Sequence, residues 1–310
     1  MKPGDVERAP GASLAAVIAA VTGDAYEVIR AAAPGDVEVR RIDADLDGVA
    51  FVVPRGDDGD ALAALAGLES LRVVQSLSAG TDWLEPHVPA WATLCNARGA
   101  RDPNMAEWVI GALLGDASGQ LAAARGRTWD RSWRPREVHG GTVLIVGHGS
   151  IGRAVEARLA AFGVRVIGVA SRARDGVHGI DELHELLPAA DAVVVLAPLT
   201  PGTRGMIDAA ALARMRDGAL LVSAGRGATV DTDALVAELG RGRLRAVLDV
   251  TDPEPLPEGH PLWDLALAVT PHNAGDTRAA DERAFALAAE QLGRFARGEP
   301  LANVVLAAGR

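Results

Sequence analysis

The segment Thr142-Val143-Leu144-Ile145-Val146-Gly147-His148-Gly149-Ser150-Ile151-Gly152 decides the fold of this chain. Its first five residues form an apolar run, typical of a strand that is covered on both faces. A G-x-G-x-x-G turn follows, and 154–162 has the composition of a helix. Glycines in this pattern allow a tight turn, close approach of a pyrophosphate and close helix–sheet packing, and the helix N-terminus favours phosphate. The segment therefore predicts a dinucleotide-binding unit.

Similar strand and helix patterns continue on both sides of this segment. On its C-terminal side we expect strands at 164–169, 192–196, 219–222 and 246–248, with helices at 180–187, 209–215 and 232–239. On its N-terminal side we expect strands at 37–42, 49–53, 72–77 and 94–97, and a helix at 61–71. Leu14, Val17, Ile18 and Val21 recur at helical spacing and predict a further helix. Strands separated by helix-length crossovers indicate an α/β fold with parallel, doubly wound sheets.

Two long helices are expected outside these runs. Asp102-Pro103 suits a helix start, with Asp102 as N-cap, and the helix from Asn104 to about Gly115 is apolar on several sides. The segment 277–298 also has helical character, and 301–306 is expected to return to the first domain.

The composition excludes several classes of protein. The chain has 310 residues and a formal net charge of −10, and it holds one lysine (Lys2), one tyrosine (Tyr26) and one cysteine (Cys95). A pyridoxal Schiff base and a P-loop each need a lysine inside the fold, and the chain has none beyond Lys2. One cysteine cannot form an internal disulfide or a multi-cysteine zinc site, and we expect no metal. The acidic balance argues against nucleic acid and anionic membranes as partners, and no apolar run reaches the ~20 residues of a membrane span. The single cysteine and the acidic first residues favour a cytoplasmic protein.

The residues after the second strand of the dinucleotide unit predict the coenzyme. An NAD site usually places Asp or Glu there for the ribose hydroxyls. This chain has Ala170-Ser171-Arg172-Ala173-Arg174, with no acid before Asp175. Ser171, Arg172 and Arg174 can bind a 2′-phosphate, so we expect NADP(H) to be favoured over NAD(H). The alternative is a solvated basic turn.

The ends of the later strands carry the candidate catalytic residues. Arg226, Glu254 and His272 follow three successive strands, and such positions meet at the carboxyl edge of a parallel sheet. Any one of the three without the other two would be interpreted as a structural residue. We expect further coenzyme contacts on the same segments from Ala197, Pro198, Thr203, Ala224, Gly225, Ala274 and Gly275.

Five motifs between Gly147 and Gly275 resemble those of the D-isomer-specific 2-hydroxyacid dehydrogenases, and the resemblance covers nearly the whole chain in order. They are the glycine loop at Gly147, Pro198-Leu199-Thr200-Pro201-Gly202-Thr203-Arg204-Gly205, Arg226-Gly227 followed by Val230-Asp231, Leu248-Asp249-Val250 with Pro253-Glu254-Pro255-Leu256-Pro257, and Pro271-His272-Asn273-Ala274-Gly275. The Arg172–Arg174 turn and Asp249-Val250-Thr251 look most like the glyoxylate/hydroxypyruvate reductase branch. The resemblance implies two Rossmann-like domains, with a coenzyme domain (98–277) inserted into a substrate domain (1–97 plus 278–310).

The resemblance also implies roles for individual residues. Arg226, Glu254 and His272 match the catalytic three, and Asp249 matches the residue that holds the nicotinamide carboxamide. Ser150 and Ile151 match the pyrophosphate contacts. On the substrate side, Arg55 matches an arginine, and Ala79 and Gly80 lie in the turn Ser78-Ala79-Gly80-Thr81-Asp82 whose amides bind the substrate carboxylate. The Asn104 helix and the Trp129–Trp133 segment match a homodimer interface. Three positions depart from the family pattern: Ser223 and Arg101 replace a usual Asn, and Gly56 a common Ser.

We therefore expect hydride transfer between NADP(H) and carbon 2 of a small 2-oxo acid, with His272 donating the proton. Glyoxylate and hydroxypyruvate are the expected substrates. One alternative is a larger acid whose second anionic group binds Arg101. Another is a formate-dehydrogenase-like activity, although that relative carries Gln where this chain has Glu254. The last is a non-catalytic, dinucleotide-sensing binding protein on the same fold.

Overall fold

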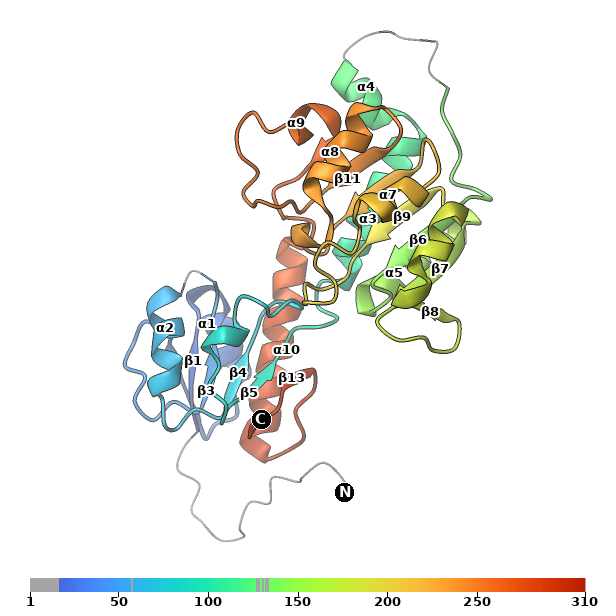
Figure 1. The fold of residues 1–310 in the computed structure, drawn as a ribbon. Helices are drawn as coiled ribbons and strands as arrows, with labels where there is room; N and C mark the ends of the chain where they lie inside the picture. Colours follow the sequence, from blue (N-terminus) through green and yellow to red (C-terminus); the bar gives the residue numbers. More distant parts are fainter. Residues whose placement is uncertain (1–16, 57, 127–128, 130, 132–133, 310) are drawn as a thin grey trace. The chain divides into compact units, whose positions relative to one another are not determined.

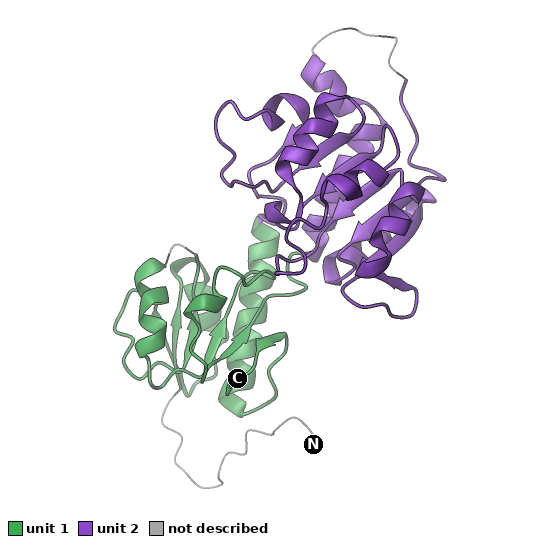
Figure 2. Cartoon of the chain, in the orientation of Figure 1, with its two compact units in different colours: residues 1–101, 278–310 green, residues 102–277 purple. Residues whose placement is uncertain are grey.

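The computed structural model describes residues 17–56, 58–126, 129, 131 and 134–309. The chain divides into two compact units, which are described separately below (Figure 2). Unit 1 holds residues 1–101 and 278–310, and unit 2 holds residues 102–277. The boundary between 101 and 102 lies four residues after the one expected from the sequence, because the long helix of unit 2 begins at Asp102.

Unit 1 is built on a six-stranded sheet with the order β13-β5-β4-β3-β1-β2. Its strands are β1 (Val17–Val21), β2 (Val37–Arg41), β3 (Phe51–Val53), β4 (Val73–Gln75), β5 (Thr93–Cys95) and β13 (Val304–Leu306). All neighbouring strands are parallel except β13, which returns from the C-terminal segment and pairs antiparallel with β5. The helices are α1 (Gly23–Ala32), α2 (Gly59–Ala64) and α10 (Arg278–Arg297) (Figure 1).

The helix expected around Val17–Val21 is wrong, because these residues form strand β1. Ala19 and Val21 face one hydrophobic cluster and Ala20 faces another, so the strand is covered on both sides. A continuously apolar strand matches helical spacing by chance, and Leu14 lies outside the described residues. The helix begins two residues later as α1, and Ile29 of α1 packs in one core cluster with Ala288 and Leu292 of α10.

Unit 2 is built on a seven-stranded, entirely parallel sheet with the order β12-β11-β10-β9-β6-β7-β8. Its strands are β6 (Thr142–Val146), β7 (Arg165–Ala170), β8 (Val177–Gly179), β9 (Ala192–Val195), β10 (Leu220–Ser223), β11 (Arg245–Leu248) and β12 (Ala268–Val269). From β6 the chain first adds strands on one side and then crosses to β9 on the other. The carboxyl ends of β6 and β9 therefore flank the point where ligands of such sheets bind.

Helices cover both faces of this sheet, and the alternation along β6 shows the two layers. Val143 and Ile145 pack with α3 (Asp102–Ala117) and α5 (Ser150–Leu159). Leu144 and Val146 pack with α6 (Leu183–Leu186), α7 (Ala209–Arg214) and α8 (Thr232–Gly240). The expected doubly wound arrangement is confirmed (Figure 1).

Four short elements of unit 2 were not expected from the sequence: α4 (Gln120–Gly126), β8, α9 (Leu262–Leu265) and β12. They have between two and seven residues, too few for a readable periodicity. Trp129, in the segment expected to take part in dimerisation, is 93% exposed, whereas Trp133 lies outside the described residues. None of the helices in the described part of the chain is long and apolar enough to cross a membrane.

Candidate active site

The three glycines of the loop after β6 meet different surroundings. Gly147 has φ +101°, and a Cβ there would lie 2.5 Å from the backbone nitrogen of Ala197, at the end of β9. A Cβ on Gly152 would lie 2.8 Å from the carbonyl oxygen of Gly147. A Cβ on Gly149, in contrast, would meet only that same oxygen, at 4.0 Å. Two glycines thus permit packing within unit 2, and Gly149 leaves open space where a ligand can approach the backbone.

Helix α5 begins immediately after this open position. Its N-cap is Gly149, which has no side chain to bond the first-turn N–H groups. The Ser150 hydroxyl, at the first helical position, donates a hydrogen bond to the carboxylate of Asp102, the first residue of α3. Ile151 packs beside a small apolar cluster of Met105, Ala224 and Ala274. The helix end suits an anion, and apolar walls lie close to it.

The basic turn after β7 contacts the glycine loop. Ser171, Arg172 and Arg174 are all exposed, and the guanidinium of Arg174 donates a hydrogen bond to the carbonyl oxygen of His148. The backbone of Arg174 pairs with Val177, so the turn is a short antiparallel bridge. The turn therefore places Arg174 against the loop, with Arg172 and Ser171 toward solvent.

His148 holds the loop in a way that was not foreseen from the sequence. Its buried ring bonds through Nε2 to Oε2 of Glu156 on α5, at 2.8 Å. The ring lies against Gly168 of β7, where a Cβ would come within 2.7 Å of the histidine Cδ2. The sequence gives no sign that His148 needs a glycine at position 168, because only the pairing of β6 with β7 brings the two residues together.

The three residues expected to be catalytic follow three neighbouring strands at the carboxyl edge of the sheet. Arg226 follows β10, Glu254 follows β11 and His272 follows β12. The Nδ1 atom of His272 lies 2.5 Å from Oε1 of Glu254. The two side chains are 43% and 41% exposed, so the pair faces solvent.

Arg226 is held through its own backbone. The half-buried residue precedes the turn Gly227–Thr229, and its carbonyl oxygen accepts bonds from the amide and the hydroxyl of Thr229. A Cβ on Gly227 would lie 1.9 Å from the carbonyl oxygen of Thr251, so the turn is pressed against the segment that leads to Glu254. The arginine and the Glu254 segment are thereby fixed side by side.

Asp249 shapes the loop that carries His272. The buried carboxylate accepts a bond from the Thr270 hydroxyl at 2.5 Å and bonds from the amides of Asn273 and Ala274 at 3.0 and 3.1 Å. The Asp249 carbonyl oxygen accepts the His272 amide at 2.8 Å, and His272 has φ +52°. Asp249 was expected to hold the nicotinamide carboxamide, and its many bonds to the loop were not foreseen.

The remaining expected coenzyme residues line the same edge. Ala197 and Pro198 follow β9, where the Thr203 hydroxyl donates to the Pro198 carbonyl at 2.6 Å. Ala224 is buried at the end of β10, and Gly225 follows it. Ser223, where the family pattern has Asn, keeps a buried hydroxyl for which the described residues offer no hydrogen-bond partner.

The residues expected to contact substrate in unit 1 lie at the carboxyl ends of its strands. Ala79 and Gly80 form a half-buried turn after β4, and the Ala79 carbonyl oxygen accepts a bond from Asn96 at 2.7 Å. Arg55 follows β3, with Nη1 2.5 Å from the carboxylate of Asp24 and Nη2 3.7 Å from that of Asp281. Arg101 also bonds Asp281, at 3.0 Å.

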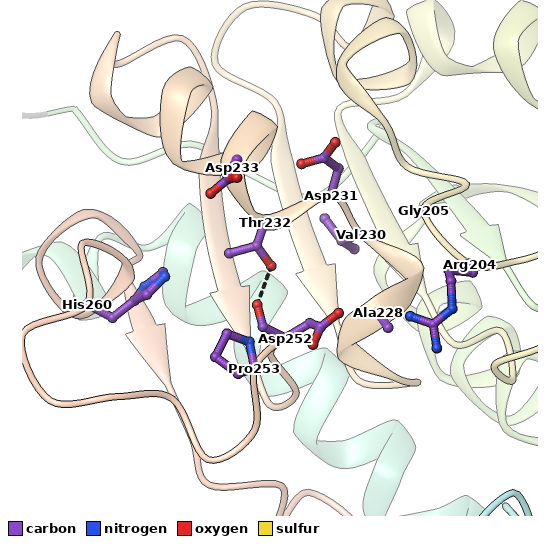
Figure 3. Close-up of a pocket in the computed structure, with 10 residues that line it drawn as sticks. All are labelled: Arg204, Gly205, Ala228, Val230, Asp231, Thr232, Asp233, Asp252, Pro253 and His260. Atoms are coloured by element: carbon purple, nitrogen blue, oxygen red, sulfur yellow. Dashed lines mark hydrogen bonds between the residues drawn. The ribbon is translucent and has the colours of Figure 1, made fainter.

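A cavity of about 460 Å³ opens in unit 2 (Figure 3). It is lined by Arg204, Gly205, Ala228, Val230, Asp231, Thr232, Asp233, Asp252, Pro253 and His260. The Thr232 hydroxyl bridges it by donating to the carbonyl oxygen of Asp252 at 2.7 Å. Arg226, Glu254 and His272 are absent from its lining, so we do not take it as the active site.

Comparisons with known proteins agree with this geometry. Residues 112–274 match the model of the D-isomer specific 2-hydroxyacid dehydrogenase NAD-binding domain. A D-3-phosphoglycerate dehydrogenase of Mycobacterium tuberculosis is 36% identical over 304 residues, 90% of this chain and 57% of the relative. A glyoxylate reductase of Thermofilum pendens is 32% identical over 248 residues, 74% of this chain and 73% of the relative.

Solved structures give the same result. A D-isomer specific 2-hydroxyacid dehydrogenase of Xanthobacter autotrophicus, in complex with NADPH and MES, has a TM-score of 0.79 at 29% identity and covers 94% of this chain and 98% of its own. An NADPH-dependent glyoxylate/hydroxypyruvate reductase of Sinorhizobium meliloti, in complex with NADP and sulfate, has a TM-score of 0.78 at 30% identity and covers 93% and 98%. The glycine loop, the three strand-end residues and these similarities lead to one conclusion: the chain belongs to the D-isomer-specific 2-hydroxyacid dehydrogenase family, whose members are oxidoreductases.

Proposed function

We propose that this protein uses NADP(H) to reduce a small 2-oxo acid, of the glyoxylate and hydroxypyruvate class, to the D-2-hydroxy acid. The observation that carries the proposal is the 2.5 Å contact between Nδ1 of His272 and Oε1 of Glu254. A carboxylate that accepts the N–H of one ring nitrogen fixes the orientation of the imidazole and leaves the other nitrogen for proton exchange. The other ring nitrogen, Nε2, is then able to give a proton to an oxygen of the substrate.

The reaction needs a hydride, an oriented substrate with a polarised carbonyl, and a proton. A bound coenzyme would supply the hydride to carbon 2, and residues of this chain are proposed for the other tasks. Arg226 donates parallel hydrogen bonds to the carboxylate and the ketone oxygen, which orients the substrate and polarises the carbonyl. His272 delivers the proton from Nε2 to the oxygen that becomes the hydroxyl. We propose Arg55, Ala79 and Gly80 as further substrate contacts, with the amides of the Ala79–Gly80 turn binding the carboxylate.

The residues of unit 2 fit a nicotinamide dinucleotide. Gly149 leaves space beside the first turn of α5, where a pyrophosphate can accept hydrogen bonds from backbone N–H groups. Ser150, Ile151, Ala197, Pro198, Thr203, Ala224, Gly225, Asp249, Ala274 and Gly275 are the other proposed contacts. The apolar cluster of Met105, Ala224 and Ala274 suits one face of a nicotinamide ring.

The proposed preference for NADP(H) rests on the turn after β7. No acid lies there to repel a 2′-phosphate, and Ser171, Arg172 and Arg174 offer charge-assisted bonds to it. Two structural relatives bind NADPH or NADP. Steady-state rates with glyoxylate, hydroxypyruvate and longer 2-oxo acids, each with NADPH and NADH, test this proposal. If the protein turns over none of these acids with either coenzyme, the proposal is contradicted.

A second candidate is a 2-oxo acid that carries a second anionic group. Arg55 and Arg101 both approach the carboxylate of Asp281, so two guanidinium groups converge in unit 1. The phosphoglycerate dehydrogenase relatives, of which this chain spans about half the length, agree with such a substrate. In Arg101→Ala, kcat/KM should fall for a dicarboxylic or phosphorylated acid and stay unchanged for glyoxylate. Arg98→Ala, at an arginine bonded to Asn303, is the matched control.

We also propose a cytoplasmic homodimer. The exposed Trp129 and the half-buried Trp108 of α3 lie in the two segments that the family resemblance assigns to the dimer interface. Sedimentation equilibrium of the full chain tests the dimer, and a monomer at micromolar concentration would contradict it.

A further inference from the structure

The contact between Asp102 and Ser150 lies at the start of the helix that is proposed to bind the coenzyme. The Ser150 hydroxyl donates to Oδ2 of Asp102, and both residues are half-buried. Helices α3 and α5 carry these residues at their first positions and pack in one core cluster through Ala106 and Val155, among others. The contact is therefore set by helix packing within unit 2.

The carboxylate of Asp102 lies beside the N-terminus of α5, where it contacts the hydroxyl of the first helical residue. The N-terminus of an α-helix carries a partial positive charge and unpaired N–H groups, both of which favour a nearby anion. Helix α5 has ten residues, and its N-cap Gly149 supplies no side-chain acceptor. Asp102 supplies a negative charge at this end from a different helix.

Ser150 cannot donate its hydroxyl proton to Asp102 and to a phosphate oxygen at the same time. A serine hydroxyl has one proton to donate, and the oxygens of a carboxylate and of a pyrophosphate are both acceptors. While Ser150 donates to Asp102, its hydroxyl cannot donate to a phosphate oxygen. A pyrophosphate at this helix end would also lie close to the charge of Asp102, and like charges repel.

We propose that Asp102 is an internal competitor of the coenzyme pyrophosphate. Its carboxylate binds the Ser150 hydroxyl in the free protein, and coenzyme binding must break this bond. This inference rests on the proposed function, in that the ligand is a nicotinamide dinucleotide at the glycine loop. Because both coenzymes contain the pyrophosphate, Asp102 lowers the affinity for NADP(H) and NAD(H) by the same factor and speeds their release.

The test is the affinity of Asp102→Asn and Asp102→Ala for NADP⁺ and NAD⁺, measured by calorimetric titration of the full chain. Both variants should bind both coenzymes more tightly, by about tenfold, the change that roughly 1.4 kcal/mol produces. The ratio of the two dissociation constants should stay that of the wild type. The gain should come mainly from slower dissociation, as is usual for changes at one interface.

Two further variants separate competition from other effects. Asp233→Ala removes an exposed acid from the first turn of α8 with the same change in net charge, and it should leave both affinities unchanged. In a Ser150→Ala background the gain from Asp102→Ala should shrink, because the hydroxyl for which the two anions compete is gone. If Asp102→Ala also lowers the melting temperature, Asp102→Asn decides, since it keeps the side-chain size.

Unchanged or weaker binding of both coenzymes to Asp102→Asn would overturn the inference and leave Asp102 a structural residue. A wild-type protein that binds neither coenzyme would instead contradict the proposed function. The two failures are therefore distinguishable.

Discussion

Glu254 lies 2.5 Å, through Oε1, from Nδ1 of His272, although the two residues are 18 positions apart in the chain. Two neighbouring strands of the unit 2 sheet, β11 and β12, bring them together. The pair is a charged acceptor next to a group that can carry a proton. The contact fixes the orientation of the His272 ring at the candidate active site.

Replacing Glu254 by Gln should lower kcat for reduction by about tenfold, the change that roughly 1.4 kcal/mol produces. The Gln amide can present either its oxygen or its NH2 group to Nδ1, so it no longer fixes the orientation of the His272 ring as the carboxylate does. The affinity for NADPH should stay that of the wild type. The measurements are kcat with hydroxypyruvate and NADPH, and a titration of the variant with NADPH. A wild-type kcat in Glu254→Gln would exclude Glu254 as the residue that positions His272.

Two glycine variants should separate an effect on stability from an effect on coenzyme binding. In Gly227→Ala the new Cβ would lie 1.9 Å from the Thr251 carbonyl oxygen, and the overlap should cost about 3 kcal/mol or more. The melting temperature of the variant should therefore fall by roughly 6–12 °C. In Gly149→Ala the nearest atom is 4.0 Å away, so the melting temperature should stay near that of the wild type while coenzyme affinity drops.

Thermal melts and coenzyme titrations of both variants check this prediction. A Gly149→Ala protein that binds coenzyme like the wild type would show that no ligand approaches the loop at this position.

The two arginines after β7 should differ in their effect on coenzyme choice. Arg172 is exposed, and Arg172→Ala should raise KM for NADPH by about tenfold while leaving KM for NADH unchanged. Arg174 also donates to the carbonyl oxygen of His148 in the glycine loop, so Arg174→Ala should raise KM for both coenzymes. Added salt should weaken the effect of Arg172, since exposed charge pairs are screened. Equal KM changes with NADPH and NADH in Arg172→Ala would refute the assignment of this residue.

Cys95 should be unreactive in the folded protein. Burial raises the pKa of its thiol to about 12, against a smaller opposing effect of a hydrogen bond from Gln291. At pH 8 only about one thiol in ten thousand would be ionised, and the thiolate is the reactive form. Because Cys95 is the only cysteine, its reaction with a thiol reagent should report the unfolding of unit 1. Rapid labelling under native conditions would contradict the buried position on β5.

Much of unit 2 could be predicted from its sequence because local pattern and burial agree there. The apolar run before Gly147 is a strand covered on both faces, as expected, and the helix after the turn begins at Ser150, four residues before the expected start at 154. In unit 1 the helix predicted around Val17–Val21 is wrong, because a buried strand there matches helical spacing. Elements as short as β12 (Ala268–Val269) had no readable period.

The sequence predicted which residues of the candidate site lie at strand ends, but not the hydrogen bonds between them. That Arg226, Glu254 and His272 follow adjacent strands could be expected from sheet topology. The bonds of Asp249 to the Thr270–Ala274 loop could not, since they depend on how the loop folds back. The contact of Ser150 with Asp102 likewise depends on the packing of α3 against α5, which sequence spacing does not encode.

The most direct test of the account is the product formed from hydroxypyruvate and NADPH by the wild type and by His272→Ala. We expect the wild type to oxidise one NADPH for each molecule of the D-hydroxy acid that it forms. His272→Ala should bind NADPH as tightly as the wild type while its turnover falls by about 10²–10⁴, the usual contribution of a positioned proton donor. Turnover by His272→Ala close to that of the wild type would contradict the central claim.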